Sequence, residues 1–115
     1  MLQGLRVVEI GQYVAAPLAA TIFADLGAQV AKVERPGGDP LRSDSALFAA
    51  WNRGKESVEL DLRTDAGRDA ARGLIAEADL VLENLRPGAL DRLGLGPETL
   101  RRGHPDLVTC SISAW

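Results

Sequence analysis

The 115-residue sequence contains few of the residue types that disulfides, metal sites and nucleophilic triads require. Cys110 is its only cysteine and His104 its only histidine. A single thiol excludes an internal disulfide and a cysteine-based metal cluster. One imidazole and one thiol make a poor metal site and cannot form a catalytic triad by themselves. We expect His104 to lie in the turn before Pro105, and Cys110 to be a small buried side chain in a strand.

Aromatic residues and long apolar runs are also scarce. Two Trp, one Tyr and two Phe residues are too few for a surface that stacks nucleic-acid bases, and the net charge is −3. No apolar run approaches the ~20 residues that cross a bilayer. Residues 1–6 lack the pattern of a secretory signal. We therefore expect a cytoplasmic protein in a reducing setting, without nucleic-acid or membrane partners.

What is present is the composition of a globular domain, with 46% hydrophobic and 25% charged residues. Short β-rich runs predict strands at residues 5–10, 29–34, 57–62, 80–83 and 107–113. Longer segments of helical character predict helices at residues 17–26, 43–52, 64–78, 87–93 and 97–102. Strands that alternate with helices over short connections predict a parallel sheet covered on both faces. The expected fold is a Rossmann-like α/β unit of about five strands.

The apolar pattern also predicts parts of the core. Ala70, Leu74, Ile75 and Ala78 recur at helical spacing and should share one buried face, and Trp51 should fill core. The strand at 107–113 is apolar on both sides, and such parallel strands need cover on both faces. We therefore expect an incomplete unit, which is either the front part of a longer protein or dependent on a partner chain. Trp115 would pack against whatever follows it.

Ligands of open α/β sheets bind beyond the carboxyl ends of the strands. Arg35, Arg63 and Arg86 each follow one of three successive predicted strands within a few residues. Guanidinium groups bind phosphates through paired hydrogen bonds, so their convergence predicts a phosphate-binding edge. Each arginine taken singly could also be an ordinary solvated loop residue.

The loop after the first strand helps to discriminate among nucleotide ligands. A dinucleotide fold carries Gly-x-Gly-x-x-Gly at this point, whereas here Gly11 stands alone. Glu34 does occupy the place of a ribose-binding carboxylate, but the two missing glycines make NAD or FAD the weaker alternative. Small residues 14–16 instead form a narrow apolar lip, which suits either a thin chain such as pantetheine or plain helix packing.

Three blocks in order resemble the opening of class III coenzyme A transferases, the family that contains formyl-CoA and carnitine CoA-transferases and α-methylacyl-CoA racemase. The first comprises Leu5–Ile10, Ala16-Pro17 and Ala24–Pro36. The second is Asn52–Leu62 and the third is Asp79–Gly94. The resemblance covers essentially the whole chain, and it implies that residues 1–115 are the amino-terminal part of the family's large Rossmann-like domain.

The resemblance also implies a coenzyme A (CoA) site, without metal, in a protein whose partners are an acyl-CoA and a carboxylic acid and which forms an interlocked homodimer. Carried over to this chain, the site residues are Tyr13, Val14, Ala15, Arg35, Leu60, Arg63, Asn84, Leu85 and Arg92. The arginines among them would neutralise the CoA phosphates. The two leucines would pack on adenine or pantetheine, and Asn84 would hydrogen-bond an amide or hydroxyl of the ligand.

Two departures from the family limit what is implied. Val14 stands where formyl-CoA transferases carry glutamine, so a formyl or oxalyl substrate is not implied. None of the nine aspartates matches the family nucleophile, which lies downstream, as does the racemase acid/base pair. We therefore assign no catalytic residue to this chain. The hypothesis is the CoA-binding part of an acyl-CoA:carboxylate CoA-transferase; the alternatives are a 2-methylacyl-CoA racemase and a non-catalytic nucleotide-binding remnant.

Overall fold

A computed structural model describes residues 1–113. Its five strands are β1 (Arg6–Ile10), β2 (Gln29–Glu34), β3 (Glu56–Glu59), β4 (Leu80–Glu83) and β5 (Val108–Ser111). They form one parallel sheet in the order β3-β2-β1-β4-β5. The order runs outward from β1 in both directions, as in doubly wound folds. The expected parallel α/β sheet of about five strands is therefore confirmed.

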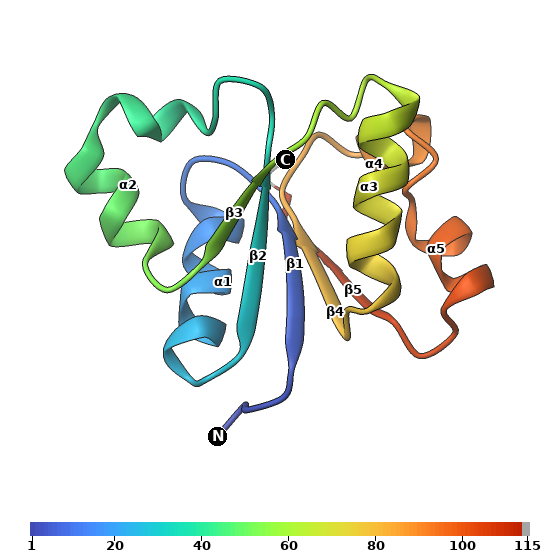
Figure 1. Ribbon diagram of the computed structural model, residues 1–115, viewed down its shortest axis with the longest axis horizontal. Coiled ribbons are helices and arrows are strands. Elements are labelled where there is room, and N and C mark those ends of the chain that lie inside the picture. Colours follow the sequence, from blue (N-terminus) through green and yellow to red (C-terminus); the bar gives the residue numbers. More distant parts are fainter. Residues whose placement is uncertain (114–115) are drawn as a thin grey trace.

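The helices cover both faces of this sheet (Figure 1). They are α1 (Ala15–Asp25), the 3-10 helix η1 (Pro40–Ser43), α2 (Ser45–Asn52), α3 (Asp65–Ala76), α4 (Ala89–Arg92) and α5 (Pro97–Gly103). In Figure 1, α1 and α2 lie on one side of the strands, and α3, α4 and α5 lie on the other. The short helix predicted at residues 43–52 is present as α2, which begins two residues later because η1 precedes it. A further difference is that β3 ends at Glu59 rather than at residue 62.

The start of α3 shows how local sequence sets an element. The Thr64 hydroxyl accepts a hydrogen bond from the Gly67 amide at 3.0 Å, which caps the helix. Gly67 packs so closely that a Cβ there would lie 1.9 Å from the Asp61 carbonyl oxygen. The buried residues of α3 are Gly67, Ala71 and Ile75. The prediction that Ala70 shares the buried face was wrong, because the buried face of α3 runs through Gly67, Ala71 and Ile75 and leaves Ala70 exposed.

The two faces of the sheet differ in what they bury. Val8 and Ile10 of β1 join a cluster with Ala71 and Ile75 of α3, and all its members are apolar. On the opposite face, Val7 packs with residues of α1 in a second apolar cluster. Successive side chains of a strand point to opposite faces, so Glu9 shares the face of Val7. This α1 face therefore changes from apolar to charged toward the carboxyl ends of the strands.

The last strand lies at the edge of the sheet beside β4. Val108 is 59% exposed, and Cys110 is exposed as well. The prediction of a buried Cys110 was therefore wrong, because within residues 1–113 no helix covers the part of β5 that carries this thiol. Trp51 is half-buried rather than a core residue. Trp115 lies outside the described residues.

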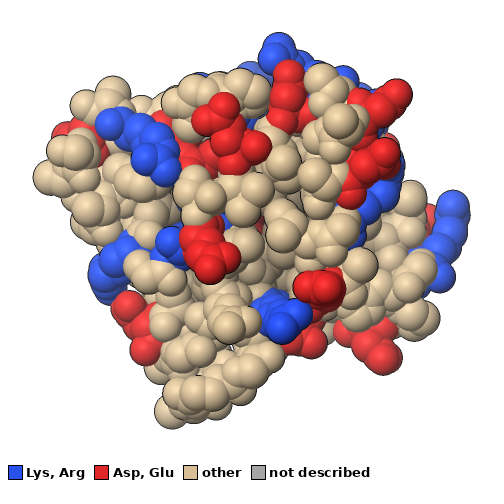
Figure 2. Space-filling model, viewed as in Figure 1, with Lys and Arg blue, Asp and Glu red and all other residues tan. Residues whose placement is uncertain are grey.

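The charged residues do not segregate into large patches of one sign on the face seen in Figure 2, where acidic and basic side chains are interspersed. None of the helices in the described part of the chain combines the length and the apolar character that crossing a bilayer requires.

Candidate functional site

Two pockets adjoin at the carboxyl edge of the sheet. The first, with a volume of about 700 Å³, lies among the loops that follow β1, β2 and β3. The second lies between the loops that follow β1 and β4 and the start of α4. Gln12 and Leu85 line both pockets. The first also contains Arg35, Leu60 and Arg63, and the second contains Tyr13, Val14, Ala15, Asn84 and Arg92. The structure therefore brings all nine carried-over residues to one edge of the molecule.

The arginines are divided between the two pockets. Arg35 and Arg63 line the first, whereas Arg86 and Arg92 line the second. Arg63 is paired with Asp61 at 2.9 Å, and this contact raises the pKa of the Arg63 guanidinium and lowers that of the Asp61 carboxyl. The positive charge of Arg63 is therefore partly balanced before any ligand arrives.

Glu34 has a different role from the one a dinucleotide site would give it. Its carboxylate is 3% exposed and accepts two hydrogen bonds from Arg42, at 2.6 and 2.7 Å. It also accepts from the Ser57 hydroxyl and, at 2.8 Å, from the Asp39 amide. Burial alone would raise the pKa of this carboxyl, but these hydrogen bonds outweigh it and lower the pKa to about 2. A carboxylate so fully engaged within the protein is a poor acceptor for a ribose hydroxyl.

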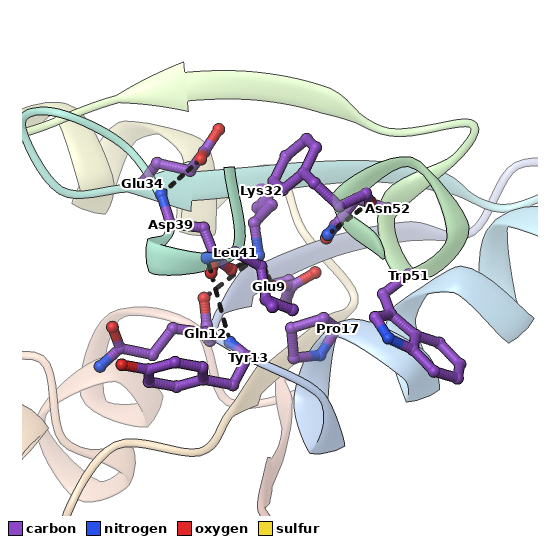
Figure 3. A network of polar contacts seen from close by, with 12 residues as sticks. Glu9, Gln12, Tyr13, Pro17, Lys32, Glu34, Asp39, Leu41, Trp51 and Asn52 are labelled. Carbon is purple, nitrogen blue, oxygen red and sulfur yellow. Dashed lines mark hydrogen bonds and ion pairs between the residues drawn. The ribbon is translucent and has the colours of Figure 1, made fainter. Parts of the chain in front are cut away.

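Sequence reasoning missed a buried network of four charged side chains beside the first pocket (Figure 3). Lys32 and Glu9 face each other on β2 and β1, with Nζ 2.7 Å from Oε2, and their side chains are 1% and 0% exposed. Lys32 Nζ also lies 3.0 Å from Asp39 Oδ2, and Lys55 Nζ lies 2.5 Å from Glu9 Oε1. A signal was present in the sequence, because Glu9 and Lys32 interrupt apolar runs predicted to be buried strands.

Lys55 joins this network to two helices. Its ammonium donates to the carbonyl oxygens of Pro17 in α1 and Trp51 in α2, at 2.8 and 3.2 Å, and to Asn52 Oδ1 at 2.8 Å. Burial lowers the pKa of Lys55, and the nearby Glu9 carboxylate opposes that effect. The network thus connects β1, β2, α1 and α2 behind the pockets.

Asn84 is held by the protein in a way the sequence did not reveal. Its Oδ1 accepts from the Gln12 amide at 3.0 Å, and its Nδ2 donates to the Gln12 carbonyl at 2.9 Å. One donor and one acceptor of the Asn84 amide are therefore taken by the loop after β1. The second N–H and the second lone pair of the Asn84 amide are not used in this pairing, and Asn84 lines the second pocket, so a hydrogen bond from Asn84 to a ligand stays a prediction.

The fold and the position of these pockets define a doubly wound α/β protein with two adjoining pockets beyond the carboxyl ends of its strands, where such folds bind ligands. The model of "CoA-transferase family III" matches residues 2–115. The chain therefore belongs to CoA-transferase family III, which confirms the resemblance seen in the sequence.

Individual relatives agree with this assignment. Over 96% of its length the chain is 43% identical to the succinyl-CoA:mesaconate CoA-transferase of Haloarcula hispanica, covering 31% of that protein. It is 39% identical to the succinate–glutarate CoA-transferase of Agrobacterium fabrum, covering 99% of this chain and 32% of the relative. The crystal structure of a CAIB/BAIF family protein from Brucella suis superposes with a TM-score of 0.96 at 43% identity, covering 99% of this chain and 33% of that one. The chain thus spans about a third of the length of these relatives.

Proposed function

We propose that the protein is an acyl-CoA:carboxylate CoA-transferase and that residues 1–115 form the CoA-binding amino-terminal part of its larger domain. The observation that carries the proposal is the meeting of Arg35, Arg63, Arg86 and Arg92 around two adjoining pockets at one edge of the sheet. CoA carries a diphosphate and a 3′-phosphate, so its binding calls for several guanidinium groups within the reach of one molecule. Family membership and the names of the relatives support the same substrate class.

The pockets also offer apolar surface next to the arginines. Leu60 lines the first pocket, and Leu85 lines both. Val14 and Ala15 form the small lip of the second pocket, at the start of α1. In this proposal the leucines pack on adenine or pantetheine, and the lip leaves room for the thin pantetheine chain. Gln12 and Leu85, which border both pockets, are placed to contact a ligand that extends from one pocket to the other.

The chemistry of such a transferase begins when a carboxylate nucleophile attacks the carbonyl carbon of an acyl-CoA thioester. The carbon–sulfur bond breaks, CoA leaves as a thiolate, and an enzyme–acyl anhydride forms. The thiolate then attacks the enzyme's own carbonyl of the anhydride, which releases the first acid and leaves an enzyme thioester. The acceptor acid completes the transfer by the same two steps in reverse. In our proposal an aspartate outside these 115 residues is the nucleophile, and the described residues hold CoA.

We further propose that the whole protein is a cytoplasmic homodimer. Large apolar side chains are exposed on α1 and α2, among them Ile22 at 52% and Leu47 at 44%. Helices that expose apolar residues beside their buried ones are typical of surfaces that another part of the protein covers. A mass measurement by light scattering would test the dimer, because a monomer at micromolar concentration contradicts it.

Calorimetric titration tests the ligand. We expect CoA to bind more tightly than dephospho-CoA, because the 3′-phosphate gives the arginines one more partner, and both to bind more tightly than NAD. The Arg35→Ala variant should weaken CoA binding about tenfold, since a charge-assisted contact contributes about 1.4 kcal/mol or more. Arg102→Ala is the matched control, because Arg102 is exposed on α5 and lines neither pocket. Equal or tighter binding of NAD would contradict the proposal.

The racemase alternative is separated from the transferase by its products. A transferase incubated with succinyl-CoA and a second carboxylic acid forms a new acyl-CoA of different mass. A racemase inverts a 2-methylacyl-CoA without needing a second acid. A non-catalytic nucleotide-binding remnant, the other alternative, would give neither product. Mass spectrometry of the acyl-CoA pool in deuterium oxide therefore distinguishes all three, because a racemase exchanges the 2-hydrogen of the 2-methylacyl-CoA for deuterium and so raises its mass.

A further inference from the structure

The turn formed by Gln12 and Tyr13 stands between the two pockets. Gln12 lines both, and Tyr13 lines the second. Tyr13 has a φ angle of 65°, and within the described residues it is the one residue other than glycine with a positive φ. Side chains that carry a Cβ adopt this left-handed conformation at a cost, so the surrounding structure must hold it.

Asn84 holds the turn from the side of β4. Its amide group makes both a donor and an acceptor contact with the backbone of Gln12, at 2.9 and 3.0 Å. Gly11 makes room for this pairing, since a Cβ at that position would lie 2.9 Å from Asn84 Oδ1. The contact therefore needs both an amide side chain at the end of β4 and a glycine at the end of β1.

Asp39 holds the turn from the side of β2. Its Oδ1 accepts from the Tyr13 amide at 3.4 Å and from the Leu41 amide at 2.9 Å. Figure 3 shows the Asp39 carboxylate directed at the Tyr13 backbone, with Lys32 close by. Asp39 Oδ2 is buried, and among residues 1–113 it makes an ion pair rather than a hydrogen bond, with Lys32 Nζ at 3.0 Å. Lys32 also donates to the Gly11 carbonyl at 3.2 Å, so it fixes both Asp39 and the start of the turn.

We propose that Asp39 and Asn84 are positioning residues that together hold the Gln12–Tyr13 turn in its left-handed conformation, and that Lys32 orients Asp39 for this role. The effect on CoA binding rests on the proposed function. When the turn loses its contact with Asp39 or with Asn84, it no longer shapes the boundary between the two pockets that we propose for CoA. Both residues thus act through the turn. This gives Asn84 a positioning role beside the predicted ligand contact, and it gives a role to Asp39, which the sequence left among turn aspartates.

Amide hydrogen exchange tests the turn without any ligand. Asp39→Ala removes the partner of the Tyr13 amide, and Asn84→Ala removes the partner of the Gln12 amide. If the turn is held as one unit, each variant should also speed exchange at the amide that it does not itself contact, by about tenfold. Asp44→Ala is the matched control, because Asp44 caps α2 through the Leu47 amide at 3.1 Å and lines neither pocket. It should leave both amides unchanged.

Calorimetry with CoA then measures the consequence for binding. Asp39→Ala and Asn84→Ala should each weaken CoA about tenfold. Asp39→Asn should also weaken CoA, because its single carboxamide oxygen cannot accept from the turn amides and face Lys32 at the same time. The double variant should lose much less than the product of the two single losses, because both act on one turn. If Asp39→Ala does not fold, Asp39→Asn and Asn84→Ala still decide the question through exchange at Tyr13.

The two proposals can fail separately. Unchanged exchange at Tyr13 in a folded Asn84→Ala variant, or losses of CoA affinity that multiply in the double variant, would overturn the positioning role. Absence of CoA binding by the unaltered protein would instead overturn the proposed function, while the exchange experiment would still report on the turn. The positioning role is supported if exchange at Tyr13 and Gln12 is faster in both single variants and the double variant loses less CoA affinity than the product of the two single losses.

Discussion

The two faces of the sheet are built from the same strands but buried by different means. The face under α3 is closed by aliphatic side chains such as Val8, Ile10 and Ile75. The face under α1 begins with Val7 and then buries Glu9 beside Lys32. Aliphatic packing stabilises without fixing direction, whereas ion pairs and hydrogen bonds need particular partners at particular angles.

The difference between the two faces indicates which part of the protein needs a defined geometry. The charged part of the α1 face lies at the carboxyl ends of the strands, next to the pockets. Lys32 reaches Gly11 and Asp39 in the loops after β1 and β2, and Lys55 reaches α1 and α2. Buried ionic groups of this kind are weak contributors to net stability. In this protein we interpret them as fixing the loops that surround the two pockets, while the opposite face supplies ordinary core.

The largest expected effect tests that contrast directly. Lys32→Met leaves the buried Asp39 without its counter-charge and Glu9 with only Lys55, so the free energy of unfolding should fall by about 3–5 kcal/mol. Ile75→Val in the aliphatic face is the comparison, with an expected loss of about 0.5–1.5 kcal/mol. Urea denaturation measures both. A Lys32→Met variant that loses no more than Ile75→Val would break the distinction between the two faces.

The next prediction concerns Glu34, a buried charged residue that lies two positions after Lys32 on β2 and therefore on the same face of the sheet. Its pKa is about 2 in the folded protein against 4.5 ordinarily, so between these values the unfolded chain binds more protons. The stabilisation is complete above pH ~4.5, is lost as the pH falls toward ~2, and amounts to about 3 kcal/mol. Urea denaturation at several pH values measures this effect. The free energy of unfolding of Glu34→Gln should fall less between pH ~4.5 and pH ~2 than that of the unaltered protein. Glu98→Gln, at an exposed site on α5, is the control and should show the same pH dependence of stability as the unaltered protein. If Glu34→Gln also shows that pH dependence, Glu34 is not its source.

The smallest expected effects compare two glycines of α3 on the aliphatic side. Gly67→Ala would place a Cβ 1.9 Å from a backbone oxygen, so the helix must shift, and about 1–3 kcal/mol of stability should be lost. Gly73→Ala meets nothing within 4 Å and should add about 0.5–1 kcal/mol, because alanine is the better helix former. Thermal unfolding of the two variants gives the signs. Equal effects at both sites would show that close packing at Gly67 is unimportant.

The sequence was a good guide to the elements and a partial guide to the site. Alternation of strands and helices predicted the parallel sheet because each short apolar run could only be buried between helices. The nine carried-over residues lie around two adjoining pockets, since eight of them follow strands that end at one edge of the sheet and α4 places Arg92 there as well. Errors arose where the tertiary position of an element mattered. Cys110 is exposed because β5 lies at the edge of the sheet, and Ala70 is exposed because the buried face of α3 runs through Gly67, Ala71 and Ile75.

The local pattern of the chain determined which segments become strands and helices and which loops meet beyond the strand ends, because periodicity and caps act over a few residues. Only the tertiary structure decided that Lys32 meets Glu9 and Asp39, and that Asn84 pairs with the backbone of Gln12. Such contacts join residues 7 to 72 positions apart, and their angles depend on how the strands are ordered and the loops packed.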